Sequence, residues 1–81
     1  MIVVSETFRK HFDDLSPQIQ RRVMQKFEQL DQQLRVWRHE RLQGRPEYKL
    51  RIGDWRVLYD FNPAQNQLLL LTVRHRREVY R

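Results

Sequence analysis

The second half of the chain carries the residue types that metal-free cleavage of RNA requires. Lys49, Arg51 and Arg56 fall on two neighbouring segments of alternating character, and residues 74–81 add four Arg, one His and one Tyr. In such cleavage a 2′-hydroxyl loses a proton and attacks the adjacent phosphate, cations neutralise the crowded phosphorane, and the 5′-oxygen is protonated as it leaves. A basic cluster of this kind can supply a base, cations and an acid.

The segments that carry these cations read as a β-hairpin. Gly53 and Asp54 separate two alternating runs, which predicts a two-residue type II′ turn. That turn places Arg51 opposite Arg56 and Lys49 opposite Leu58 on one side of the hairpin, and its apolar residues on the other. Like charges directly opposite each other lower stability unless a ligand neutralises them. The two arginines also disfavour the protonated form of Lys49, which makes this lysine the candidate base.

A purely structural interpretation of these cations stays open. Exposed sheet faces often carry Lys and Arg for solubility, and the cations can extend into solvent or pair with Asp60 and Glu78. The basic run 74–81 favours a binding role. The interleaved Val79 and Tyr80 indicate a segment that docks, rather than a tail that frays.

The overall charge points to a polyanionic partner. The 81 residues carry 16 Lys and Arg against 10 Asp and Glu, for a net charge of +6. Residues 1–40 hold seven basic and six acidic side chains, whereas residues 41–81 hold nine and four, so the excess belongs to the second half. Thirteen of the cations are Arg, whose planar guanidinium binds phosphate in a bidentate way. We therefore expect a nucleic acid rather than a membrane as the partner.

Several classes of site are excluded or disfavoured. Cysteine is absent, so there is no disulfide framework, thiolate nucleophile or Cys-ligated metal. The acids and the three His residues lack the spacing of metal ligands, and we expect neither metal nor cofactor. The longest apolar run, Leu68 to Leu71, is far shorter than a membrane span, and the first residues lack the features of a signal peptide. The expected location is the cytoplasm.

Two helices are predicted in the first half, after a short apolar run at Met1 to Val4 that fits a buried strand. Ser5 can cap a helix whose stripe is Phe8, Phe12 and Leu15. Ser16 and Pro17 are a typical N-cap and first helical residue of the second helix. Its stripe consists of Ile19, Val23, Phe27, Leu30 and Leu34, and its outer face is polar.

Strands are predicted in the second half, after a loop over residues 37–46. The hairpin strands run from Tyr48 to Ile52 and from Trp55 to Phe61, and a third strand runs from Gln67 to about Arg74. The unbroken leucines of the third strand predict burial on both of its faces. The fold class is therefore α+β in a single domain, 1–81: a short N-terminal strand, two amphipathic helices and a three-stranded antiparallel meander, with the helices on one side.

Two segments resemble the RelE branch of the RelE/ParE toxin superfamily. They are residues 42–59, LQGRPEYKLRIGDWRVLY, and residues 73–80, VRHRREVY. The block L-x-G-x-x-x-Y-[KR]-x-R-x-G-D-[YW]-R-[VL]-x-Y with a terminal H-R-x-x-V-Y is fairly specific for that branch. The predicted order of strand, two helices and three strands also resembles the family, so the resemblance spans nearly the whole chain.

The resemblance implies a toxin of a type II toxin–antitoxin pair that enters the ribosomal A site and cleaves messenger RNA there. It assigns activation of the 2′-hydroxyl to Lys49, phosphate binding to Arg56 and Arg76, and stacking on a nucleotide to Tyr80. His75 is implied as a possible general acid. The RNA-binding residues implied are Arg45, Arg51, Arg74, Arg77 and Arg81. Which of Arg74, Arg76 and Arg77 is catalytic stays open.

The resemblance also implies partners. These are a cognate antitoxin, the ribosome with its messenger and ribosomal RNA, and operator DNA reached only through the antitoxin complex. Two other functions stay open: a ParE-like toxin that inhibits gyrase without RNase activity, and a basic module that binds RNA without cutting it. The set of Lys49, Arg56, Arg76 and Tyr80 favours cleavage, because a gyrase inhibitor has no chemical need for it.

Overall fold

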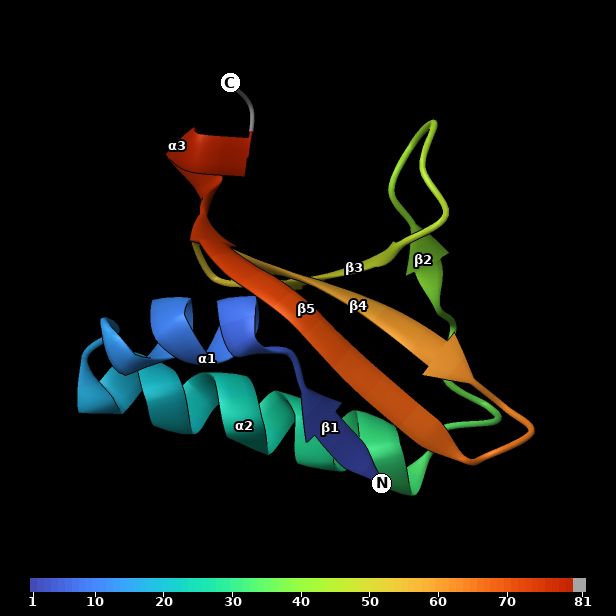
Figure 1. Ribbon diagram of the computed structural model, residues 1–81. Helices are drawn as coiled ribbons and strands as arrows, with labels where there is room; N and C mark the ends of the chain where they lie inside the picture. Colours follow the sequence, from blue (N-terminus) through green and yellow to red (C-terminus); the bar gives the residue numbers. More distant parts are fainter. Residues whose placement is uncertain (80–81) are drawn as a thin grey trace.

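The computed structural model describes residues 1–79, and side chains for residues 1–77. Its elements run in the order β1 (Ile2–Val4), α1 (Glu6–Asp13), α2 (Pro17–Gln32), β2 (Glu40–Arg41), β3 (Tyr48–Ile52), β4 (Trp55–Asn62), β5 (Gln67–His75) and α3 (Arg76–Val79). Helices α1 and α2 lie together beneath one face of the sheet (Figure 1). The α+β class and the helices on one side are confirmed.

Within the described residues, the sheet has five strands in the order β1-β5-β4-β3-β2. Strands β3, β4 and β5 form the predicted antiparallel meander, while β1 pairs with β5 in parallel. Strand β2 lies inside the stretch predicted as loop, where Glu40 pairs with Lys49 and Arg41 with Tyr48. Two residues show too little alternation to indicate a strand from sequence. Strand β1 is only half-buried, not buried as predicted, because it lies at the edge of the sheet.

Serine caps begin both long helices, as predicted. The Ser5 hydroxyl accepts a hydrogen bond from the backbone N–H of Phe8, and the Ser16 hydroxyl accepts one from Ile19. Pro17 follows at the start of α2, where its fixed φ suits a helix and no N–H is needed. The caps fix where each helix starts and therefore which stripe it presents to the sheet.

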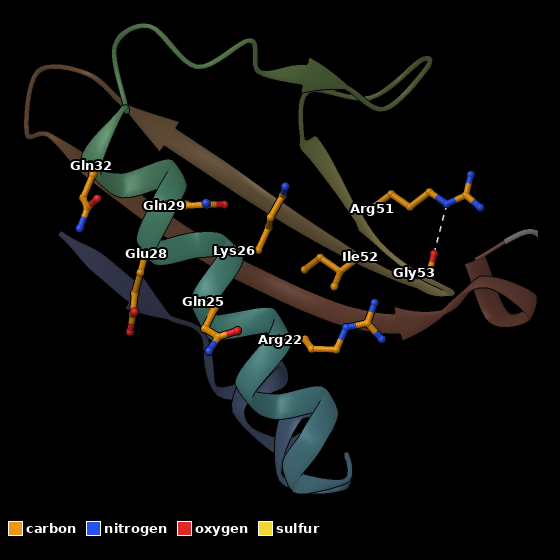
Figure 2. A pocket seen from close by; sticks show the side chains of 9 residues that line it. All are labelled: Arg22, Gln25, Lys26, Glu28, Gln29, Gln32, Arg51, Ile52 and Gly53. Carbon is orange, nitrogen blue, oxygen red and sulfur yellow. Dashed lines mark hydrogen bonds between the residues drawn. The ribbon is translucent and has the colours of Figure 1, made fainter.

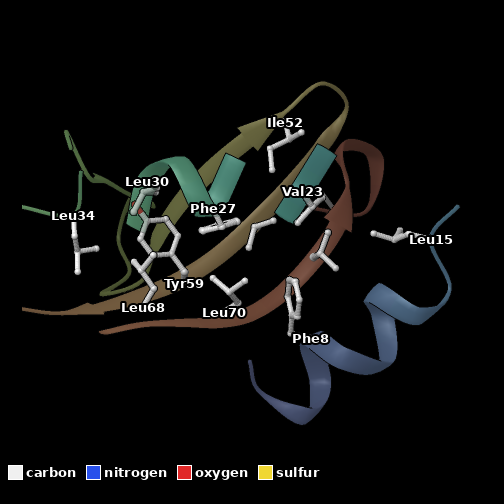
Figure 3. Close-up of a cluster of buried hydrophobic side chains, with 12 residues drawn as sticks. Phe8, Leu15, Val23, Phe27, Leu30, Leu34, Ile52, Tyr59, Leu68 and Leu70 are labelled. Carbon is white, nitrogen blue, oxygen red and sulfur yellow. The ribbon is translucent and has the colours of Figure 1, made fainter. Parts of the chain in front are cut away.

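The core lies between these stripes and the helix-facing side of the sheet (Figure 3). The buried residues are Phe8, Leu15, Val23, Phe27, Leu30, Leu34, Ile52, Val57, Tyr59, Leu68, Leu70 and Val73. The ring of Phe27 meets the ring of Tyr59 edge-on at a centroid distance of 5.5 Å. Burying this many aliphatic and aromatic side chains is the main stabilising contribution in a chain this small.

The hairpin register is the one predicted. Ile52 pairs with Trp55, Arg51 with Arg56 and Lys49 with Leu58. Gly53 takes a φ of +59° at the first turn position, a conformation that favours glycine and fits a type II′ turn. The turn therefore fixes which hairpin residues face the helices and which face away.

Candidate functional site

Three arginines form a row across the open face, which is the side of the sheet turned away from α1 and α2. Arg56 on β4 pairs directly with Arg51 on β3 and with Arg74 on β5. Residues that pair directly point to the same side of a sheet, with Cβ atoms about 4.5–5.5 Å apart. The row therefore concentrates three positive charges on neighbouring strands, a suitable arrangement for phosphate oxygens.

Lys49 belongs to the next row of the open face. It pairs with Leu58, which in turn pairs with Thr72 on β5. Two residues along a strand span about 6.6 Å, so Lys49 lies one row from Arg51. The structure thus brings together Lys49, Arg51, Arg56 and Arg74 of the residues that the sequence singled out.

A β-bulge decides which basic residue of β5 joins the row. The register between β4 and β5 shifts between Leu58 and Tyr59, where Tyr59 pairs with Leu70 but Leu58 pairs with Thr72. One extra residue reverses the alternation of every residue that follows. In an unbroken ladder Arg74 would pair with Trp55 and face the helices. The bulge instead aligns Arg74 with Arg56.

The same bulge corrects the prediction for β5. The leucines were expected to be buried on both faces, but only Leu68 and Leu70 are buried, whereas Leu69 and Leu71 stay half-buried. Among the described residues no helix covers the open face above them, so two leucines remain accessible there.

The junction between β1 and α1 holds the bulge in place. The Ser5 hydroxyl donates to the carbonyl of Leu71 at 2.7 Å while it caps α1, and the backbone N–H of Ser5 donates to the carbonyl of Leu70. Nδ1 of His11 lies 3.2 Å from the Thr72 hydroxyl. These contacts tie the bulged residues to the start of the chain.

His75 lies on the other side of the sheet from the arginine row. It pairs with Trp55, and the two rings meet edge-on at 5.1 Å. Its Nδ1 lies 3.3 Å from the backbone N–H of Arg77, as acceptor. This placement follows from the bulge. It puts His75 on the other side of the sheet from Lys49, and that separation does not suit a general acid acting opposite this base.

Arg76 and Arg77 begin α3, the short helix that rises above the end of β5 (Figure 1). The backbone N–H of Arg76 donates to the carbonyl of Asp54 in the hairpin turn at 2.6 Å. With Asp54 and His75, both arginines line a hollow of about 640 Å³ beside that turn. Because α3 rises on the side of the sheet away from α1 and α2, it lies at one end of the open face (Figure 1). Tyr80 and Arg81 lie outside the described residues.

The segment from β2 to β3 forms an arm that rises at the other end of the sheet (Figure 1). Arg45 and Glu47 pair at its tip, with Nε to Oε2 at 3.1 Å and Nη2 to Oε1 at 3.3 Å. The hydrogen bonds from Arg45 lower the pKa of Glu47 below its ordinary value, and the pair raises the pKa of Arg45. Arg45 is thus held beside the open face. Glu47 was not among the predicted site residues, although an Arg and a Glu two residues apart in a loop indicate such an ion pair.

Asp60, one of the two acids considered as partners for the cations, takes part in neither of the ion pairs described within residues 1–77. These pairs join Met1 with Asp31 and Arg45 with Glu47. Arg51 donates from Nε to the carbonyl of Gly53 at 3.2 Å. Glu78, the other acid considered, lies outside the residues whose side chains are described.

A second hollow lies beside the open face, at the edge of the sheet between α2 and β3 (Figure 2). Its volume is about 620 Å³, and its lining includes Arg22, Lys26 and Arg51. β2 pairs with β3 only at Tyr48 and Lys49, so no described strand pairs with the rest of this edge. The groove adds cations next to the row.

Among the described residues, no group of three or more His, Cys, Asp or Glu residues is placed to hold a metal ion. No helix in this part of the chain has the length and apolar character that a membrane span requires.

The fold is that of RelE toxins. Over 99% of this chain and 89% of the other, it matches the isolated Escherichia coli RelE toxin with a TM-score of 0.78 at 20% identity. A chain of the RelBE2 toxin–antitoxin complex from Mycobacterium tuberculosis matches at 27% identity and a TM-score of 0.76, over 94% and 90% of the chains. A chain of the RelB–RelE complex from Methanococcus jannaschii matches at 20% and 0.74, over 96% and 94%. No curated protein sequence matches.

A match to a family model assigns the chain to a protein family. The model of the ParE toxin of type II toxin–antitoxin systems, parDE, matches residues 2–80. The chain therefore belongs to the ParE toxin family, within the RelE/ParE superfamily, and is a toxin of a type II toxin–antitoxin system. The resemblance to this superfamily is confirmed.

Proposed function

We propose that this toxin is a ribosome-dependent endoribonuclease that cuts messenger RNA in the A site and so stops translation. The observation that carries the proposal is the row of Arg51, Arg56 and Arg74 with Lys49 one row away. Three guanidinium groups on adjacent strands suit the charge that develops on a phosphorane, and a lysine beside them suits the proton of a 2′-hydroxyl. We place the toxin in the cytoplasm as a single domain.

The reaction is an internal transesterification, in which the 2′-oxygen replaces the 5′-oxygen on the phosphorus. Lys49 accepts the proton of the 2′-hydroxyl, the 2′-oxygen bonds to phosphorus, and the bond from phosphorus to the 5′-oxygen breaks. Arg56, at the centre of the row, stabilises the phosphorane, with Arg74 beside it. The 5′-oxygen takes a proton from water as it leaves, and Lys49 returns the proton it accepted to solvent. The products are a 2′,3′-cyclic phosphate and a 5′-hydroxyl. We assign no step to His75, because it faces the other side of the sheet.

The remaining cations have supporting roles in this proposal. Arg45 on the arm and Arg76 and Arg77 at α3 stand at opposite ends of the open face, where they can bind the RNA backbone on either side of the cut. Tyr80 and Arg81 keep the nucleotide-stacking and RNA-binding roles that the resemblance implies. Partners are the ribosome, a cognate antitoxin and, through the antitoxin, operator DNA. The comparison structures of RelBE complexes support the antitoxin.

The test is primer extension on messenger RNA in a purified translation system. We expect cuts within A-site codons for the native protein and no cuts without ribosomes. Arg56→Gln removes the central cation of the row, and we expect cleavage to fall by about 10²-fold to 10³-fold. Arg21→Gln removes an exposed arginine on α2 and is the matched control, with cleavage unchanged. Intact messenger with native protein would overturn the proposal.

Inhibition of gyrase is the second candidate, and the match to the ParE family favours it. It predicts loss of DNA supercoiling by gyrase while messenger RNA stays intact. The third alternative, a basic module that only binds RNA, predicts binding that weakens steeply with salt and gives no cleavage product.

A further inference from the structure

The open face has a hollow of about 540 Å³ between the arm and the start of α1. Leu42, Leu58 and Leu71 give it apolar surface, and Arg45, Glu47 and Arg74 lie among its polar lining. A hollow that combines apolar surface with placed polar groups is typical of a site for a small ring system. Beside the arginine row, such a surface suits an occupant with a planar ring.

The position of the hollow relative to the arginine row suits a nucleotide. Leu58 lies two residues from Arg56 along β4, a separation of about 6.6 Å, and pairs with Lys49. Arg74 belongs both to the arginine row and to the lining of the hollow. A nucleotide whose phosphate lies on the row can therefore extend its base over Leu58 without leaving the open face.

The arm supplies groups that can distinguish one base from another. Each oxygen of the Glu47 carboxylate accepts from Arg45 and keeps a further lone pair, while Arg45 keeps donors beyond those two bonds. The lowered pKa of Glu47 keeps it ionised at neutral pH, as an acceptor for amino groups. Donor and acceptor thus stand side by side next to an apolar surface.

We propose that this hollow is a subsite for one nucleobase, seated on Leu58 and Leu71 and read by Glu47 and Arg45. The inference rests on the proposed RNA-cleaving function and deepens it by naming a source of sequence preference. The occupant is a base rather than a protein segment, because the hollow adjoins Lys49 and shares Arg74 with the row that suits a phosphate.

The test is an NMR titration of the full chain carrying labelled leucine methyl groups. The probes are the four ribonucleoside 5′-monophosphates, and ribose 5-phosphate is the control ligand. Both kinds of probe can bind the arginine row, but only the nucleotides carry a base. We expect the methyl signals of Leu42, Leu58 and Leu71 to shift with the nucleotides and to stay in place with ribose 5-phosphate.

Matched variants locate the effect. Leu58→Ala removes part of the floor, and we expect nucleotide affinity to fall about fivefold. Leu69→Ala removes a half-buried leucine of β5 outside the hollow, and we expect no change. Glu47→Gln keeps the shape but replaces an acceptor with a donor. We expect it to alter the ranking of the four nucleotides by about tenfold.

Equal shifts with nucleotides and ribose 5-phosphate would overturn the inference, as would equal losses in Leu58→Ala and Leu69→Ala. Leucine signals that move with the cognate antitoxin but not with any nucleotide would assign the hollow to a protein partner and also overturn it. The titration needs no ribosome, so its result is independent of cleavage. Absence of cleavage with base-dependent shifts would contradict the proposed function alone.

Discussion

Arg51 and Arg56 are direct cross-strand partners on the open face of the sheet. Two like charges at this spacing oppose folding, and Arg74 on the next strand adds a third. A polyanionic ligand that binds the row reduces this repulsion, so charges that favour binding oppose folding.

This opposition predicts how salt changes the effect of Arg51→Gln. Removing the Arg51 charge should remove about 0.2–1 kcal/mol of repulsion at low salt. That gain should vanish at high salt, where the charges of the native protein are screened. Urea unfolding of both proteins at two salt concentrations measures this. The stability of Arg51→Gln relative to the native protein should fall as salt rises, and a difference that does not depend on salt would contradict the prediction.

The two serine caps predict a difference in stability between two variants. Ser5→Ala and Ser16→Ala each remove a helix cap, which costs about 0.5–2 kcal/mol. Ser5 also donates to the carbonyl of Leu71 in the bulge, so its loss should cost about 0.5–1.5 kcal/mol more. Unfolding by denaturant compares the two variants directly. Equal losses would show that the hydrogen bond to the bulge contributes nothing.

Tyr59 predicts how stability depends on alkaline pH. Burial, and then the negative charges that Tyr48 and Glu40 carry at high pH, raise its pKa above the ordinary 10.0. The folded state thus keeps the phenol protonated where the unfolded state has lost the proton. Its stabilising contribution is complete below pH 10 and falls as pH rises from there towards the folded pKa.

Thermal melting between pH 8 and pH 12 checks this dependence. Tyr59→Phe is the control, because it removes the ionisable group and keeps the ring against Phe27. The variant leaves Nδ1 of His39, which lies 2.8 Å from the Tyr59 hydroxyl, without that partner. We therefore expect a lower melting temperature at neutral pH and a weaker fall above pH 10. An equally steep fall in the variant would contradict the assignment.

Local rules of turn and helix formation explain the parts of this structure that the sequence predicts. A two-residue turn at Gly53 leaves one register for the hairpin, so the pairing of Arg51 with Arg56 follows from the turn. The stripes of α1 and α2 follow in the same way from their caps and spacing. Each of these features depends on residues close together in the sequence.

The bulge at Leu71 does not follow from local rules. Four successive leucines give no alternation to show where a residue is inserted, and the insertion depends on contacts of Ser5 with β5. The choice between Arg74 and His75 for the open face therefore needed the structure. The same holds for Glu47 and the hollow beside the arm, which combine residues from four segments of the chain.

The central claim is that the open face promotes attack by a 2′-hydroxyl on messenger RNA. The most direct measurement compares two messages in programmed ribosomes, identical except that one carries a 2′-deoxynucleotide on the 5′ side of the cut. We predict that the toxin cuts the all-ribose message, leaves a 2′,3′-cyclic phosphate, and spares the substituted message. Equal cutting of both messages, or of neither, would contradict the account.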